Sequence, residues 1–152
     1  MNGKWKKSLA LLLLSAAAAA LLAGCGDVAY KDGTYTARSS EYASFDEDLD
    51  AEVDGYGVVE LTIRDGAIAA CTFTTYQNDG TVKDSEYGKQ NGEVANQDYY
   101  NKAQRAVKAC QQYADQLVET GDLRSVDAIS GATISFDQFN EAADLALDQA
   151  KG

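Results

Sequence analysis

Hydrophobic and polar residues alternate along residues 56–64, which predicts a half-buried β-strand with Val59, Leu61 and Ile63 on its inner face. Asp65-Gly66 comes next, a dipeptide typical of the two-residue type I′ hairpin turn. Residues 67–76 then form the predicted return strand, and its inner face carries Cys71, Phe73 and Thr75. This hairpin is the clearest local pattern in the chain.

Two shorter segments precede the hairpin. Residues 34–39 have the composition of a strand and follow an Asp-Gly turn. Residues 46–54 are the most acidic run, and we interpret them as a solvated loop. Asp50, Glu52 and Asp54 match the first positions of an EF-hand loop, but Leu61 stands where the bidentate glutamate belongs. This mismatch argues against a calcium site.

Apolar residues recur at three- and four-residue steps in two later segments, the period of an amphipathic helix. The first helix is predicted over 98–120, with Asp98 as N-cap and Gly121 after its last turn. The second is predicted from Phe136 to about Ala150, with Ser135 as N-cap and Gln138 completing a capping box. The expected inward residues are Tyr100, Ala103, Val107, Cys110, Ala114 and Leu117 in the first helix, and Phe139, Ala143, Ala146, Leu147 and Ala150 in the second.

The expected fold class is therefore α+β, a small antiparallel sheet packed against two amphipathic helices.

The N-terminus has the pattern of a lipoprotein signal. It contains a basic segment (Lys4, Lys6, Lys7), an apolar run over 9–22, and Leu22-Ala23-Gly24-Cys25, which has the form of a lipobox. A transmembrane helix or an ordinary secretory signal is the alternative, but the run is short and ends in small residues and cysteine. We expect a lipoprotein signal peptide over 1–24, a lipidated tether over 25–31 that starts at Cys25, and one domain over 32–152.

Charge limits what the mature chain can bind. All 24 acidic residues follow Cys25, whereas three of the 13 basic residues precede it, so ten basic residues face 24 acidic ones and the formal charge is −14. Such a surface repels nucleic acid and anionic headgroups. An anionic ligand must therefore be held by local donors or by a covalent bond. The chain contains no histidine, which excludes histidine-based catalytic triads and argues against a zinc or haem site.

Cys71 and Cys110 remain in the mature chain. Outside the cytoplasm two cysteines can form a disulfide. Each of them falls on a predicted core face, however, which favours two buried thiols.

The candidate site lies in residues 127–135, where a loop of small residues runs into the second helix. The N-terminus of a helix offers unpaired N–H groups that favour an anion. Ser130, Gly131 and Ala132 are small enough for a phosphate to approach the backbone, and Thr133 adds a hydroxyl beside it. An ordinary loop before a capped helix explains the same spacing.

Ser-Gly-Ala-Thr-Ile-Ser, preceded by Asp127, resembles the flavinylation motif of the FMN-binding domain family. That family includes the flavin subunits of Rnf-type and sodium-pumping quinone reductase complexes, and small extracytoplasmic lipoproteins. The resemblance implies that Thr133 carries FMN through a phosphoester bond, which a Mg-dependent flavin transferase installs from FAD. It makes Asp127 the motif acid and gives Ser130, Gly131, Ala132 and Ser135 as surrounding cofactor-binding residues.

The resemblance continues upstream through residues 32–35, 58–68 and 84–89. It implies that Glu86, Tyr87 and Lys89 border the flavin. Tyr87 could stack on the isoalloxazine ring, and Lys89 could place a positive charge near the phosphate or the N1/C2 carbonyl region. The alternative for this segment is a solvated surface loop.

We therefore expect a membrane-anchored electron carrier on the extracytoplasmic face, rather than an enzyme with its own substrate. It would take electrons from a membrane quinone or NADH dehydrogenase-type partner, and nucleic acid is not an expected partner. Two alternatives remain: a redox sensor or reductase module that binds FMN without a covalent link, and a surface lipoprotein without redox chemistry.

Replacing the proposed lipid-bearing cysteine tests the anchor. Cys25→Ala removes the thiol that would be acylated, so the variant should leave the membrane fraction in cell fractionation. A processed Cys25→Ala protein that still sediments with membranes would contradict the anchor.

Overall fold

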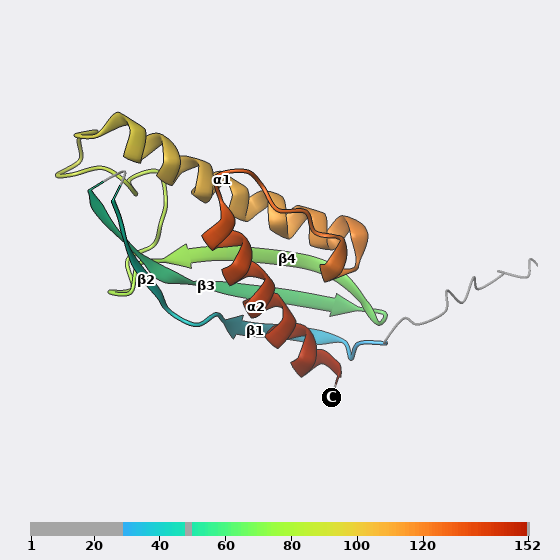
Figure 1. Ribbon diagram of the computed structural model, residues 1–152. Helices are drawn as coiled ribbons and strands as arrows, with labels where there is room; N and C mark the ends of the chain where they lie inside the picture. Colours follow the sequence, from blue (N-terminus) through green and yellow to red (C-terminus); the bar gives the residue numbers. More distant parts are fainter. Residues whose placement is uncertain (1–28, 48–49, 152) are drawn as a thin grey trace, which may run out of the picture.

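A four-stranded antiparallel sheet carries two helices on one face in the computed structural model, which describes residues 29–47 and 50–151 (Figure 1). The proposed signal peptide and Cys25 lie outside the described residues. The elements follow in the order β1 (Gly33–Arg38), β2 (Tyr42–Asp46), β3 (Ala51–Arg64), β4 (Ala67–Tyr76), α1 (Gln97–Thr120), a 3₁₀ turn (Leu123–Ser125) and α2 (Thr133–Lys151). The predicted α+β class is confirmed.

The long strand β3 is the centre of the sheet. It pairs with β4 along one edge, and along the other edge with β1 and then β2. Asp65 and Gly66 have φ of 54° and 75°, the left-handed values that a type I′ turn requires, so the predicted hairpin is confirmed. The acidic run 46–54 was predicted as a loop, which is wrong for Asp46 and for residues 51–54, because β2 pairs with residues 51–55 of β3. Residues 47 and 50 lie in a turn between the two strands. Backbone pairing here outweighs the poor strand propensity of acidic residues.

The core lies between the inner face of the sheet and the two helices. Val59, Leu61 and Ile63 are buried as the alternation predicted, and all five predicted inward residues of α2 are buried too. In α1 the pattern is only partly right. Tyr100 and Val107 are half-buried, whereas Ala109 and Tyr113 belong to the core. Val107 borders a cavity, described below, in place of the core.

Both predicted N-caps are wrong. The N-cap of α1 is Asn96, whose side chain accepts a hydrogen bond from Tyr99 N at 3.0 Å, and Asp98 lies in the first turn. Helix α2 begins at Thr133, because Phe136 N already donates to Ala132 O at 2.9 Å.

Ser135 is therefore the third residue of α2, and no capping box forms. The Gln138 amide instead donates to Gly55 O at 2.9 Å and ties α2 to β3. The predicted end of α1 is right, since Gly121 takes the left-handed conformation and its N–H bonds to Leu117 O.

Cys71 and Cys110 carry free thiols, half-buried and buried respectively, as the core-face argument favours. Burial raises the pKa of the Cys71 thiol to about 12. Within the described part of the chain, no helix has the length and apolar character needed to cross a membrane.

Candidate functional site

The loop before α2 is a tight turn over Ile129–Ala132. Ala132 N donates to Ile129 O at 3.1 Å, and Gly131, the third residue of the turn, has φ of 81°. A positive φ at this position is typical of a type II turn, and it explains why glycine stands there. The turn delivers Thr133 to the first position of α2.

A buried tyrosine hydroxyl from α1 holds this turn in place. Tyr113 Oη accepts a hydrogen bond from Ile129 N at 3.1 Å and donates one to Ala132 O at 3.2 Å. The Tyr113 side chain has no exposed surface, and its ring stacks on Phe139 and contacts Phe136, at centroid distances of 5.7 and 5.4 Å. A residue of the hydrophobic core therefore fixes the position of the loop.

Beside the turn lies a cavity of about 200 Å³. Its apolar wall comes from α1 (Ala103, Ala106 and Val107), and its polar wall includes Thr75, Lys83 and Gln138. Thr133 borders the cavity and is exposed. The volume is smaller than the roughly 300–1,000 Å³ of typical ligand pockets, so a tricyclic ring would be only partly enclosed.

Three hydroxyl residues of the motif differ in their access to the cavity. Thr133 is exposed at its border, whereas Ser135 borders it but is only 7% exposed and lies beside the Cys110 thiol. Ser130 is exposed but does not line the cavity. Of the three, Thr133 is therefore the one that is both exposed and at the border of the cavity.

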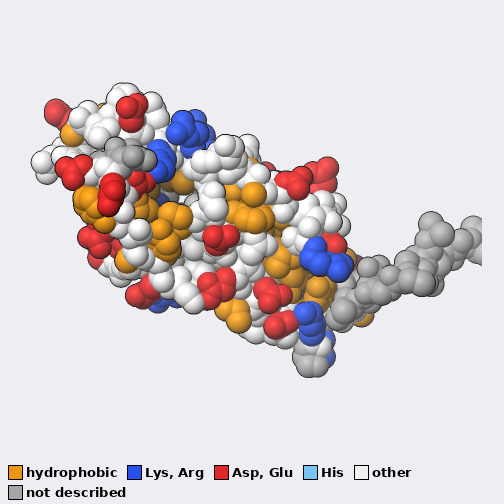
Figure 2. Space-filling view, in the orientation of Figure 1, with side chains coloured by type: hydrophobic (Ala, Val, Ile, Leu, Met, Phe, Trp, Pro, Cys, Tyr) orange, Lys and Arg blue, Asp and Glu red, His pale blue; other side chains and the backbone are white. Residues whose placement is uncertain are grey.

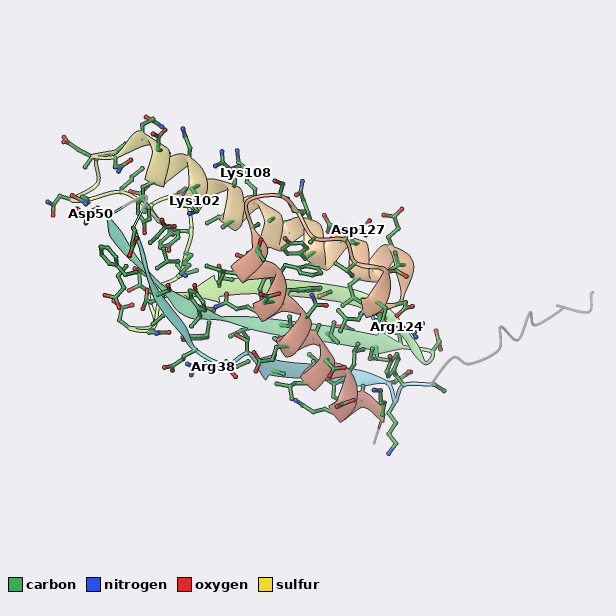
Figure 3. All side chains as sticks on the ribbon, in the orientation of Figure 1. Arg38, Asp50, Lys102, Lys108, Arg124 and Asp127 are labelled. Atoms are coloured by element: carbon green, nitrogen blue, oxygen red, sulfur yellow. The ribbon has the colours of Figure 1, made fainter. Side chains whose placement is uncertain are left out.

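Basic side chains gather around this cavity although the chain as a whole is acidic. Lys83 and Lys102 line it, and a methyl group on Gly131 would lie 3.4 Å from Arg105 Nε, which places the guanidinium against the turn. Residues 99–114 of α1 contain three basic residues and no acidic one. Lys102 and Lys108 lie along α1 in Figure 3, and blue side chains are present among white ones in this region of Figure 2. The local field around Thr133 is thus more favourable to an anion than the net charge indicates.

One residue of the segment 84–89 lines the cavity. Tyr87 lines it, and the Tyr87 ring meets Tyr99 edge-on at a centroid distance of 6.3 Å. Burial and the neighbouring Tyr99 hydroxyl raise the pKa of Tyr87, so its hydroxyl stays protonated. The two rings therefore form a wall of the cavity.

Glu86 and Lys89 do not reach the cavity of Thr133. They form an ion pair of 2.7 Å and border a separate, more open hollow that shares the Tyr87–Tyr99 wall. Asp127 is exposed and away from the cavity, and its backbone N–H donates to Gln116 Oε1 at 2.9 Å. Figure 3 shows Asp127 on the connection beside α1.

Sequence reasoning missed the cations of the site, Lys83, Lys102 and Arg105. The acid-free stretch of α1 is a usable signal for the last two, since it is unusual in a chain with 24 acidic residues. No local sequence pattern predicts that Lys83 belongs to the site. It reaches the site because its N–H pairs with Thr75 O at 2.8 Å, just past the end of an irregular loop.

A family model for the FMN-binding domain matches residues 53–148, which include β4, α1, most of α2 and the Thr133 turn. The chain belongs to the FMN-binding domain family. It is accordingly an FMN-binding protein, a flavoprotein whose cofactor is FMN. The matched range covers every element that borders the cavity.

Two solved structures resemble this FMN-binding domain. The crystal structure of a protein from Clostridium perfringens has a TM-score of 0.56 and 20% sequence identity, over 80% of this chain and 89% of that chain. The solution NMR structure of a Clostridium thermocellum protein has a TM-score of 0.40 and 24% identity, over 80% and 93%. The first supports the fold described above. A comparison with curated proteins gives no match.

Removing one hydroxyl tests how the turn is held. Tyr113→Phe keeps the ring but leaves the Ile129 N–H without its partner, so it should lower the free energy of unfolding by about 1–3 kcal/mol. Urea unfolding measures the loss, and hydrogen exchange should show faster exchange at the Ile129 amide.

Tyr56→Phe is the matched control, since the Tyr56 hydroxyl makes no hydrogen bond to the described residues. A Tyr113→Phe protein as stable as this control, with an equally protected Ile129 amide, would show that the hydroxyl does not hold the turn.

Proposed function

We propose that this FMN-binding domain is a membrane-anchored, extracytoplasmic electron carrier that holds FMN on Thr133 through a phosphoester bond. The observation that carries the proposal is the position of the Thr133 hydroxyl. It is exposed, stands at the first residue of α2 within the family's motif, and borders the cavity. A phosphoester keeps the cofactor without depending on affinity, which suits an acidic protein outside the cell.

Attachment is a phosphoryl transfer that a separate, Mg-dependent flavin transferase would catalyse. Thr133 Oγ1 forms a bond to the flavin-side phosphorus of FAD, the bond to the bridging oxygen of the diphosphate breaks, and AMP leaves. The hydroxyl proton passes to a base of the transferase or to solvent. Asp127 is exposed and away from the cavity, which favours a role towards the transferase and its Mg²⁺ over one in holding the flavin.

Residues of the cavity have the chemistry to hold FMN. Arg105 lies against the turn that carries Thr133 and suits the phosphate. Lys102 lines the cavity but forms an ion pair with Asp46, and Ala103, Ala106 and Val107 offer an apolar surface to the ring. Tyr87 offers an aromatic wall. FMN, when bound, supplies the capacity to accept and release electrons. The chain itself binds, orients and shields it.

The anchor and the partners rest on the sequence. Lipidation of Cys25 would hold the domain at the membrane surface, where a membrane quinone or NADH dehydrogenase-type partner could deliver electrons. The cavity also favours a second candidate, because it can bind FMN without a covalent link. In that case the flavin leaves on denaturation, as expected of a redox sensor or reductase module.

Replacing Thr133 tests the covalent link. In cells that also express a flavin transferase, the native protein should gain the mass of FMN less one water, on the peptide that contains Thr133. Thr133→Ala should lose this increment because it has no nucleophilic oxygen, whereas Thr133→Ser should keep it. Intact-mass and peptide mass spectrometry measure the outcome.

Ser130→Ala and Ser135→Ala are the matched controls, since each removes a neighbouring hydroxyl and should keep the flavin. Flavin that stays on Thr133→Ala after denaturation would show that another residue is the attachment point. Flavin that leaves the native protein on denaturation would favour the second candidate.

Replacing Arg105 tests the phosphate contact. Arg105→Gln removes a charge next to the turn, and an exposed charge pair contributes about 0.2–1 kcal/mol. We therefore expect the affinity of the apoprotein for free FMN to fall by a factor of about 1.4 to 5 at low salt. Fluorescence titration measures it, and the difference from the native protein should shrink as salt is added.

Lys108→Gln is the control, because it removes the same charge from the same helix at a residue that does not lie against Gly131 of the turn. Equal losses in the two variants would indicate a general effect of net charge and would contradict a specific role for Arg105.

A further inference from the structure

Of the two lysines that line the cavity, Lys83 is half-buried whereas Lys102 is exposed. Lys83 follows the β-bridge between Tyr76 and Val82, and its half-buried side chain lines the same cavity as Thr133. Gly55 makes room for it, since a Cβ at Gly55 would lie 2.7 Å from Lys83 Nζ. The route of this side chain into the cavity therefore depends on a glycine in β3.

The positive charge of the Lys83 ammonium group is only partly balanced by neighbouring groups of the protein. Its nitrogen donates to the backbone oxygen of Asp54 and lies 4.9 Å from the centroid of the Tyr87 ring. It forms no ion pair with any described carboxylate, and the Asp54 carboxylate accepts instead from Asn78 N at 2.9 Å. A lysine has three N–H donors, and a single hydrogen bond of Lys83 to the described residues leaves two for another acceptor.

Burial lowers the pKa of Lys83, while the Asp54 carboxylate and the Cys110 thiol act in the opposite direction. A desolvated cation gains from an acceptor or a negative charge placed next to it, because little water screens the interaction. Lys83 and Tyr87 both line the cavity, which offers space for such an acceptor.

We propose that Lys83 is a positioning residue for the bound FMN: it donates to the carbonyl-bearing ring of the flavin and stabilises the negative charge that reduction adds there. The inference rests on the proposed function for the attachment at Thr133, and it assigns the ring contact to Lys83. Lys83 thereby raises the reduction potential of the bound flavin.

Lys89 is the rival for this role, since the sequence alone favours it. Its ammonium group already pairs with Glu86, and it borders the separate hollow beyond the Tyr87–Tyr99 wall. Lys83 has no ion-paired carboxylate among the described residues and lines the same cavity as Thr133. The geometry therefore favours Lys83.

The test compares the midpoint potential of flavin-loaded proteins. The native protein, Lys83→Gln, Lys83→Arg, Lys89→Gln and Lys31→Gln are each made with a flavin transferase, and intact mass confirms loading. Lys31→Gln is the matched control, because Lys31 is exposed on the chain before β1 and lines no part of the cavity. Reduction against a dye of known potential gives each value.

Lys83→Gln should make reduction at least about tenfold less favourable, which corresponds to about 30 mV for a two-electron couple. Lys83→Arg keeps the charge and should stay close to the native value, and Lys31→Gln and Lys89→Gln should not shift. An unchanged potential in Lys83→Gln, or a larger shift in Lys89→Gln, would overturn the proposal.

A second measurement needs no variant, so it stands even where Lys83→Gln does not fold. In the native protein labelled with ¹⁵N, the side-chain signal of Lys83 should move when the flavin is reduced, while that of Lys31 should not. A Lys83 side-chain signal with the same chemical shift in the oxidised and the reduced protein would overturn the proposal.

The two hypotheses fail separately. Covalent loading of every variant with equal potentials refutes the role of Lys83 and leaves the attachment at Thr133 intact. Flavin that the native protein loses on denaturation refutes the covalent link, and the same potentials are then compared with FMN bound without it.

Discussion

The hydroxyl of Tyr113 joins the hydrophobic core to the site. It is buried with no exposed surface, and it bonds to both ends of the turn that precedes α2. Two backbone groups in a buried setting need partners, and one hydroxyl satisfies both of them. Packing of the Tyr113 ring against Phe139 and Phe136 transmits the position of α1 to the first residue of α2. The placement of Thr133 thus depends on core packing as much as on the motif.

Much of the fold follows from periodicity. The hairpin of β3 and β4 was predictable because one face is buried and its turn needs two left-handed residues. The boundaries of α2 were not. Ser135 has the composition of an N-cap, yet tertiary contacts start the helix at Thr133 and bury Ser135. Gln138 likewise fits a capping box but bonds to Gly55 O in β3, a contact 83 residues away that no local pattern contains.

The site was predictable where chemistry lies in one short segment and not where it is assembled from several. Thr133, Gly131 and Ala132 come from one motif and do lie together at the cavity. Lys83 comes from a loop after β4, and Lys102 from α1, so only the fold brings them near Thr133. Lys89 has the right chemistry in the right segment, but it points to a different hollow and pairs with Glu86.

The modest volume of the cavity has a consequence for access to the bound FMN. A ring that the protein encloses only in part keeps one edge at the surface, where a partner can approach without any lid having to open. The same open edge also leaves the ring accessible to water and other small molecules.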